Sequence, residues 1–107
     1  MPNFYKNAKI DLTTTGVTVL YTAPASKTAI FKSILVSEDS GNADTITATI
    51  TDASDAVFSL FKVKAVAANT TVELITQPIV VETGEILKFT AATANRLHVV
   101  ASYLEIS

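Results

Sequence analysis

The sequence contains no cysteine and no tryptophan, and it has a single histidine, His98. Without cysteine, disulfide bonds, thiolate metal sites, cysteine nucleophiles and thiol redox switches are excluded, so packing must stabilise the fold. The lack of tryptophan argues against a sugar-binding module of the usual kind, which relies on exposed aromatic rings. One histidine argues against a cupin-like metal enzyme, because such a site needs several histidine ligands.

Long apolar runs are also missing. No window approaches the ~18 consecutive apolar residues of a membrane span, and the start of the chain, Met1 to Lys6, lacks the apolar core of a signal peptide. The Lys and Arg residues are spread along a chain of formal charge -2, so they form no basic stripe for phosphate backbones. We expect a soluble protein, made in the cytosol, that binds no cofactor, nucleic acid or membrane.

What the sequence does have is apolar surface. Of its 107 residues, 49% are hydrophobic and only 17% are charged, against about 25% in a typical globular protein. This length predicts one domain spanning residues 1–107. Because each strand of a two-layer sheet buries only one face, the apolar surplus predicts a surface that meets a partner.

Short runs rich in Thr, Val and Ile alternate with turn residues such as Gly16, Pro24, Gly41 and Gly84, and apolar residues do not recur at helical spacing. The pattern predicts an all-β, single-domain antiparallel β-sandwich of eight to nine strands. The predicted strands are Ala8 to Leu12, Val17 to Thr22, Thr28 to Ser37, Thr45 to Asp52, Val57 to Val66, Thr70 to Thr76, Ile79 to Val81, Glu85 to Ala91 and Arg96 to Ile106.

Three segments carry more specific expectations. Residues 1–9 precede the first clear turn and are predicted to form an N-terminal arm that could reach a neighbouring subunit. The segment 45–51 alternates Thr with Ile or Ala, which predicts one wet and one dry face. The segments 30–36 and 97–104 place apolar residues on both faces, so either a β-bulge shifts their register or a neighbouring subunit covers their outer face.

The sequence offers little for catalysis. His98 and Ser102 share one strand face but lie two pleats apart, roughly 13 Å, which is too far for a nucleophile and its base. We interpret His98 as an ordinary strand histidine; a pH-dependent or binding role at an interface is the alternative.

Acidic residues gather in two predicted loops. Asp39 and Asp44 lie in one, and Asp52 and Asp55 lie in the next. A Ca²⁺ ion bridging the two loops is one interpretation, since hard cations prefer such oxygens. Acidic turns whose side chains accept hydrogen bonds from their own backbone explain the same residues more simply, and we prefer this interpretation.

Lysines mark one further surface. Lys62 and Lys64 share a strand face, with Lys32 and Lys88 on other strands that could lie nearby. Charged residues on outer strands discourage sheet-to-sheet pairing, which is the simpler interpretation. Alternatively, they form a basic patch that docks on an acidic partner.

Four phrases of the sequence are similar to those of a known family. They are VLYTAPASKTAIFKSI at 19–34, AANTTVEL at 67–74, PIVVETGEILKF at 78–89 and VVASYLEI at 99–106. They resemble the turn-and-strand plan of small bacteriophage virion proteins over most of the chain, from about Val17 onward. The resemblance implies a jelly-roll-like or immunoglobulin-like sandwich, present in many copies as a head decoration (cement) protein or a tail accessory protein.

The resemblance also implies a function without catalytic residues. A decoration protein binds itself and the major capsid or other virion proteins, so we expect a virion location and favour a trimer. The residues expected to make these contacts are Phe4, Tyr5, Tyr103, Leu104 and Ile106. A carbohydrate- or receptor-binding module of a phage tail or fibre is the alternative function.

Overall fold

The structure, a computed structural model, describes residues 3–75 and 77–106. These residues form nine strands and no helix, so no helix long and apolar enough to cross a membrane occurs among them. The strands are β1 (Asn3–Leu12), β2 (Thr18–Thr22), β3 (Thr28–Glu38), β4 (Asp44–Thr51), β5 (Val57–Val66), β6 (Thr71–Glu73), β7 (Ile79–Val81), β8 (Ile86–Ala91) and β9 (Leu97–Ile106).

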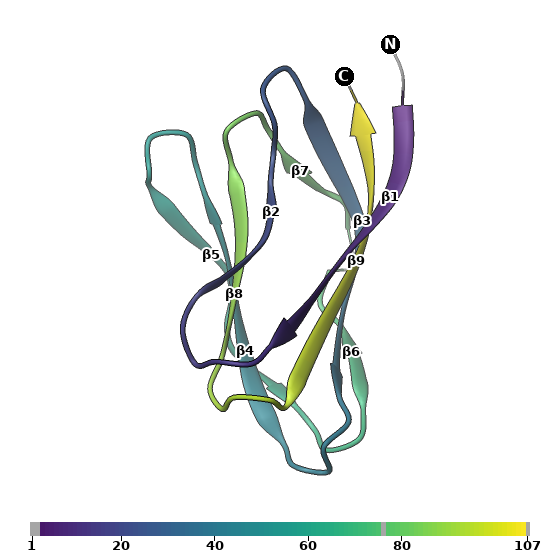
Figure 1. Cartoon of the computed structure of the whole chain (residues 1–107), viewed down its shortest axis with the longest axis vertical. Coiled ribbons are helices and arrows are strands. Elements are labelled where there is room, and N and C mark those ends of the chain that lie inside the picture. Colours follow the sequence, from purple (N-terminus) through teal and green to yellow (C-terminus); the bar gives the residue numbers. More distant parts are fainter. Residues whose placement is uncertain (1–2, 76, 107) are drawn as a thin grey trace.

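The strands pack as two antiparallel sheets (Figure 1). The first, called sheet A here, has the order β1-β9-β3-β6, with β7 also paired to β3; the second, sheet B, has the order β2-β8-β4-β5. If β6 and β7 count as one interrupted strand, eight strands interleave in the order of a jelly roll. The predicted all-β sandwich and its nine strands are therefore confirmed.

The alternation of side chains explains how the two sheets meet. Along β9 every odd residue from Leu97 to Glu105 is buried and faces sheet B, while the even residues face outward. Sheet B contributes buried side chains to the same core from β4 (Ile46 and Ala48) and from β8 (Leu87 and Phe89). The wet face predicted for 45–51 is the partly exposed outer face of sheet B, where Thr45, Thr47 and Thr49 lie, whereas Thr51 at the end of the strand is buried.

The two strands with apolar residues on both faces behave differently. In β3 a register shift between Phe31 and Ser33 leaves Lys32 as an extra residue, so that Phe31 and Ile34 both point into the core. β9 has no such shift within its pairing with β1, and Val100, Leu104 and Ile106 lie on the outer face of sheet A. The bulge predicted as one of two explanations is thus present in β3.

The N-terminal arm is a correction. Residues 3–9 are the first part of β1 and pair with β9 from Asn3 opposite Ile106 to Leu12 opposite Leu97. β1 begins five residues earlier than predicted because an exposed edge strand needs no apolar alternation, so its sequence carries no burial pattern. The remaining predicted residues of this arm, Met1 and Pro2, lie outside the described residues.

Other strand boundaries agree to within one residue, except at the end of β6. The predicted strand ran to Thr76, which lies outside the described residues, but β6 ends at Glu73. After it, Leu74 and Ile75 are both buried in the core, and the Leu74 N–H donates to the Ile34 carbonyl (2.8 Å). Pro78, which has no N–H for a ladder, precedes β7.

One buried hydroxyl yields a test of the packing. Thr51 Oγ1, at the end of β4, is buried and has no hydrogen-bond partner among the described residues. Thr51→Val keeps the shape and removes the unsatisfied group, so the free energy of unfolding in urea should rise by about 1 kcal/mol. Thr49→Val, on the partly exposed outer face of the same strand, is the matched control and should change it by less than about 0.5 kcal/mol. An unchanged or lowered stability of Thr51→Val would show that the hydroxyl is satisfied.

Candidate functional site

A buried carboxylate, Glu105, lies near the end of β9, where β9 pairs with the start of β1 (Figure 1). Glu105 of β9 points inward: its Oε1 accepts from Lys6 Nζ (2.9 Å) and lies 3.5 Å from Lys27 Nζ, and its Oε2 accepts from the Tyr21 hydroxyl (2.7 Å). The Lys6 and Tyr21 hydrogen bonds lower the pKa of Glu105 against the opposing effect of burial. The carboxylate therefore stays ionised at neutral pH and clamps β1, β9 and β2 together.

Three aromatic rings pack beside this clamp. The ring centroids of Tyr21, Phe31 and Tyr103 lie 4.8 to 5.3 Å apart, and they join β2 of sheet B to β3 and β9 of sheet A. Burial, followed by the hydrogen bond to Glu105, raises the pKa of Tyr21 well above its ordinary value. Tyr103 is thus largely buried, because the odd residues of β9 face inward, and its role as an interface residue stays a prediction.

A second buried carboxylate holds the opposite end. Glu38, at the end of β3, accepts hydrogen bonds from the N–H groups of Ser40, Gly41, Asn42 and Asn69 at 3.0 to 3.2 Å and from the Ser40 hydroxyl. Burial alone would raise its pKa, but these hydrogen bonds outweigh it and lower the pKa to about 2. Glu38 therefore fixes the β3–β4 loop and the turn before β6.

The acidic loops do not come together. Asp39 and Asp44 flank the start of β4 and Asp52 and Asp55 follow its end, about 25 Å away along an eight-residue strand, so no ion can bridge them. Asp52 Oδ1 instead accepts from the N–H groups of Ser54 and Ala56, both at 2.9 Å, as the preferred interpretation of an acidic turn expects. No group of three or more acidic or histidine side chains suited to a metal occurs among residues 3–75 and 77–106.

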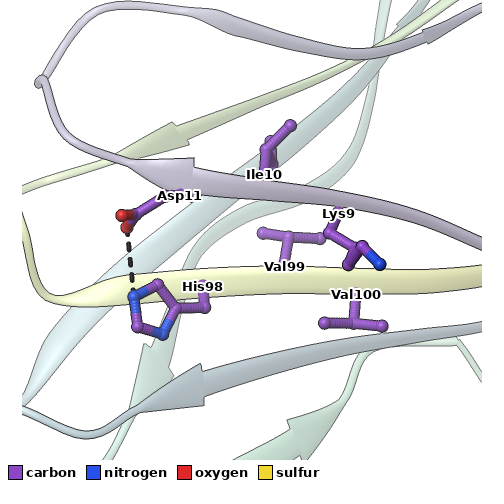
Figure 2. A pocket seen from close by; sticks show the side chains of 6 residues that line it. All are labelled: Lys9, Ile10, Asp11, His98, Val99 and Val100. Atoms are coloured by element: carbon purple, nitrogen blue, oxygen red, sulfur yellow. Dashed lines mark ion pairs between the residues drawn. The ribbon is translucent and has the colours of Figure 1, made fainter.

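His98 lies in a shallow open groove on the outer face of sheet A (Figure 2). Its Nε2 is 3.1 Å from Asp11 Oδ1 on β1, and its Nδ1 is 3.6 Å from Asp39 Oδ2. Figure 2 shows the Asp11 carboxylate turned toward the ring, while Lys9 extends away from this pair. The two carboxylates lie against different ring nitrogens, so the His98 side chain bridges Asp11 of β1 and Asp39 of the β3–β4 loop.

The other predicted interface residues divide between two faces. Tyr5, Leu104 and Ile106 lie on the outer face of sheet A, where Tyr5 is directly opposite Leu104. Leu104 in turn is opposite Ile30, which is opposite Val80, so one apolar row crosses the sheet. Phe4 faces the other way, half exposed, with Lys6 Nζ 5.8 Å from its ring centroid.

A second groove adjoins this row. Its lining residues are Tyr5, Lys6 and Asn7 of β1, Lys32 of β3, and Ser102 and Tyr103 of β9. Asn7 is opposite Ser102, and the Tyr5 side chain is 78% exposed. Lys32 is the extra residue of the β3 bulge. Sequence analysis could not locate that bulge and therefore could not place Lys32 in this groove.

The most exposed apolar strand is β5, the edge of sheet B. Val57, Phe58 and Val63 are 61%, 55% and 61% exposed, and Leu60 and Phe61 are partly buried. Sequence analysis did not single out these residues, because their strand reads as an ordinary one. We call Val57, Phe58, Leu60, Phe61 and Val63, with the exposed Lys62 and Lys64, the β5 surface.

The backbone of β5 is irregular in the middle of this surface. Two register shifts interrupt its pairing with β4, and Val63 has a positive φ of 53°, which is unfavourable for a β-branched residue. The Val63 N–H donates to Thr47 Oγ1 (3.1 Å) in place of a ladder bond. Bulges and lysines on an edge discourage another strand from pairing with it, so this edge presents its side chains and not a free strand ladder.

Comparison with known proteins identifies the fold and no family. No protein-family model and no curated protein sequence matches the chain. Among solved structures it is similar to a protein of the disulfide-linked pili of Bacillus endospore appendages, with a TM-score of 0.58 and 11% identity over 98% of this chain and 88% of that one. It is also similar to a chain of infectious bursal disease virus, Gx strain, with a TM-score of 0.55 and 13% identity over 98% of this chain and 30% of that one. At these identities the likeness establishes a shared β-sandwich fold.

The hydrogen bonds around the Glu38 carboxylate, called the Glu38 cage here, predict how the stability of the protein depends on pH. Because folding lowers the pKa of Glu38 from 4.5 to about 2, its contribution is complete above pH 4.5 and is lost as pH falls toward 2. Glu38→Gln should lower stability at pH 7 and flatten its decline between these pH values, measured by urea unfolding at each pH. Glu73→Gln, at an exposed position of β6, is the control and should keep the wild-type profile. An equally steep decline in Glu38→Gln would contradict the cage.

Proposed function

We propose that the chain is a non-enzymatic structural protein of a bacteriophage particle, most specifically a head decoration protein that binds the shell through its β5 surface. The observation that carries the proposal is that three apolar side chains of one edge strand, Val57, Phe58 and Val63, are each more than half exposed. Exposed apolar groups of this size on a small soluble domain are typical of protein contacts.

The charges of the β5 surface indicate the kind of partner. Lys62 and Lys64 are exposed beside the apolar side chains, and neither has a carboxylate within ion-pair distance in the described part of the chain. An acidic patch on a shell subunit would complement them, in line with the alternative interpretation of these lysines as a basic docking patch. The apolar side chains would supply affinity and the lysines would supply orientation.

The fold and the sequence phrases support this assignment. The same sandwich occurs in a chain of a virus and in a protein of spore pili, and the sequence resembles small phage virion proteins over most of its length. The pili are described as disulfide-linked, a link that a chain without cysteine cannot make. Assembly of this protein would therefore rest on non-covalent contacts.

The state of the reactive side chains supports a role without catalysis. Glu38, Asp52 and Glu105 are each used in hydrogen bonds that hold loops or strands, and His98 lies between Asp11 and Asp39. Each of these groups therefore stabilises the fold through its own contacts. They support the function of a rigid structural protein that binds its partners through its surface.

The mechanism would be stabilisation by binding. A ligand that binds the closed shell better than its open or burst states stabilises it, and many weak sites on one particle act together. The proposal places the protein on the virion with capsid subunits and copies of itself as partners. The trimer favoured from the sequence stays a prediction. It agrees with the cyclic symmetry that is common among self-associating domains.

Phe58 provides the test. Phe58→Asp, at a 55% exposed position, should leave the fold intact and weaken binding to particles of the parent phage by at least about tenfold, measured by cosedimentation over a range of concentrations. Val19→Asp makes the same kind of change at a half-exposed position on β2, the opposite edge of sheet B, and should bind as wild type does.

Either of two results would contradict the proposal. One is that wild-type protein fails to saturate a defined number of sites on the particle. The other is that Phe58→Asp binds as tightly as wild type, which would remove the β5 surface from the contact.

A further inference from the structure

The groove lined by Tyr5, Asn7, Lys32 and Ser102 lies on sheet A, whereas the β5 surface belongs to sheet B. It is therefore available when the β5 surface is occupied. Four kinds of group converge there: an exposed aromatic ring, an amide, a hydroxyl and an ammonium. Saccharide sites combine the same groups, since the ring packs on sugar C–H faces while polar side chains bond to hydroxyls.

The bulge in β3 places the cation. Phe31 is opposite Tyr103 and Ser33 is opposite Ser102, so Lys32 is the additional residue between two paired positions. Bulges commonly redirect a side chain beside a functional site. Here the bulge brings an exposed lysine to the row of Asn7 and Ser102, in the middle of a sheet face.

The charges around the groove favour an anion. Lys32 and Lys9 have no carboxylate within ion-pair distance among the described residues. Lys6, which also lines the groove, is bonded to Glu105, and Asp11, beyond Lys9, is paired with His98. The local excess of positive charge would attract a carboxylate or sulfate group.

The spacing indicates the size of the ligand. Tyr5, Asn7 and Lys9 alternate on the outer face of β1, about 7 Å apart, so the ring and the second ammonium are separated by about 14 Å. A short oligosaccharide laid along β1 spans this length, with one residue on Tyr5 and acidic groups near Lys32 and Lys9.

We propose that this groove binds an acidic oligosaccharide, with Tyr5 as the stacking platform and Lys32 as the main anion contact. The activity goes beyond the decoration role: it would let a particle carrying many copies adhere to a surface that displays such glycans.

The test uses the purified full chain on an array that carries sulfated, sialylated and uronic-acid glycans beside their neutral counterparts, followed by calorimetric titration of the best binder. Acidic glycans should be retained and their neutral counterparts lost. Lys32→Ala should weaken binding by about tenfold, as expected for removal of a charge-assisted hydrogen bond. Tyr5→Ala should weaken it by about threefold to tenfold.

Two controls separate this site from other effects. Lys62→Ala removes the same charge from the β5 surface of sheet B and should leave glycan affinity unchanged. Phe58→Asp, which tests the docking surface, should also bind glycan as wild type does. The proposal is overturned if no acidic glycan is retained, if Lys62→Ala weakens binding as much as Lys32→Ala, or if inorganic sulfate alone binds as tightly as the glycan.

Discussion

The bulge at Lys32 is the constraint on which much of the structure depends. β3 is the central strand that pairs with β9, β6 and β7, and it must place both Phe31 and Ile34 in the core although they are three positions apart. Strict alternation would expose one of the two, and an extra residue between them resolves the conflict. Phe31 can then pack with Tyr21 and Tyr103 across the two sheets, and the extra residue itself becomes an exposed lysine beside Ser102.

Each end of the sandwich is held by a buried glutamate carboxylate, and the two ends differ in the groups that donate hydrogen bonds to it. At one end the buried Glu105 accepts hydrogen bonds from Lys6 and Tyr21, and at the other the buried Glu38 is held by backbone N–H groups and the Ser40 hydroxyl. Each carboxylate joins segments that are far apart in the sequence. With no cysteine in the chain, these polar clamps and the apolar core fix the loops, which leaves the sheet faces and the β5 edge for contacts.

The sequence predicted the fold well because turn residues and β-branched runs act locally. Strands such as 57–66 and 79–81 were predicted to the residue, whereas the first five residues of β1 were missed because pairing with β9 leaves no pattern in an exposed strand. The site was predicted less well, since it depends on long-range register. The burial of Tyr103 could not be predicted because β9 is apolar on both faces, and Lys32 could not be placed in a groove without knowing where the bulge falls.

The central claim is that the β5 surface meets the particle, and hydrogen–deuterium exchange of the protein free and bound to particles of the parent phage tests it most directly. The account predicts slower exchange on binding for the backbone amides of residues 57–63, while the amides of β1 and of the groove are unchanged. Protection confined to β1 and β9, with β5 exchanging at the same rate in both states, would contradict it.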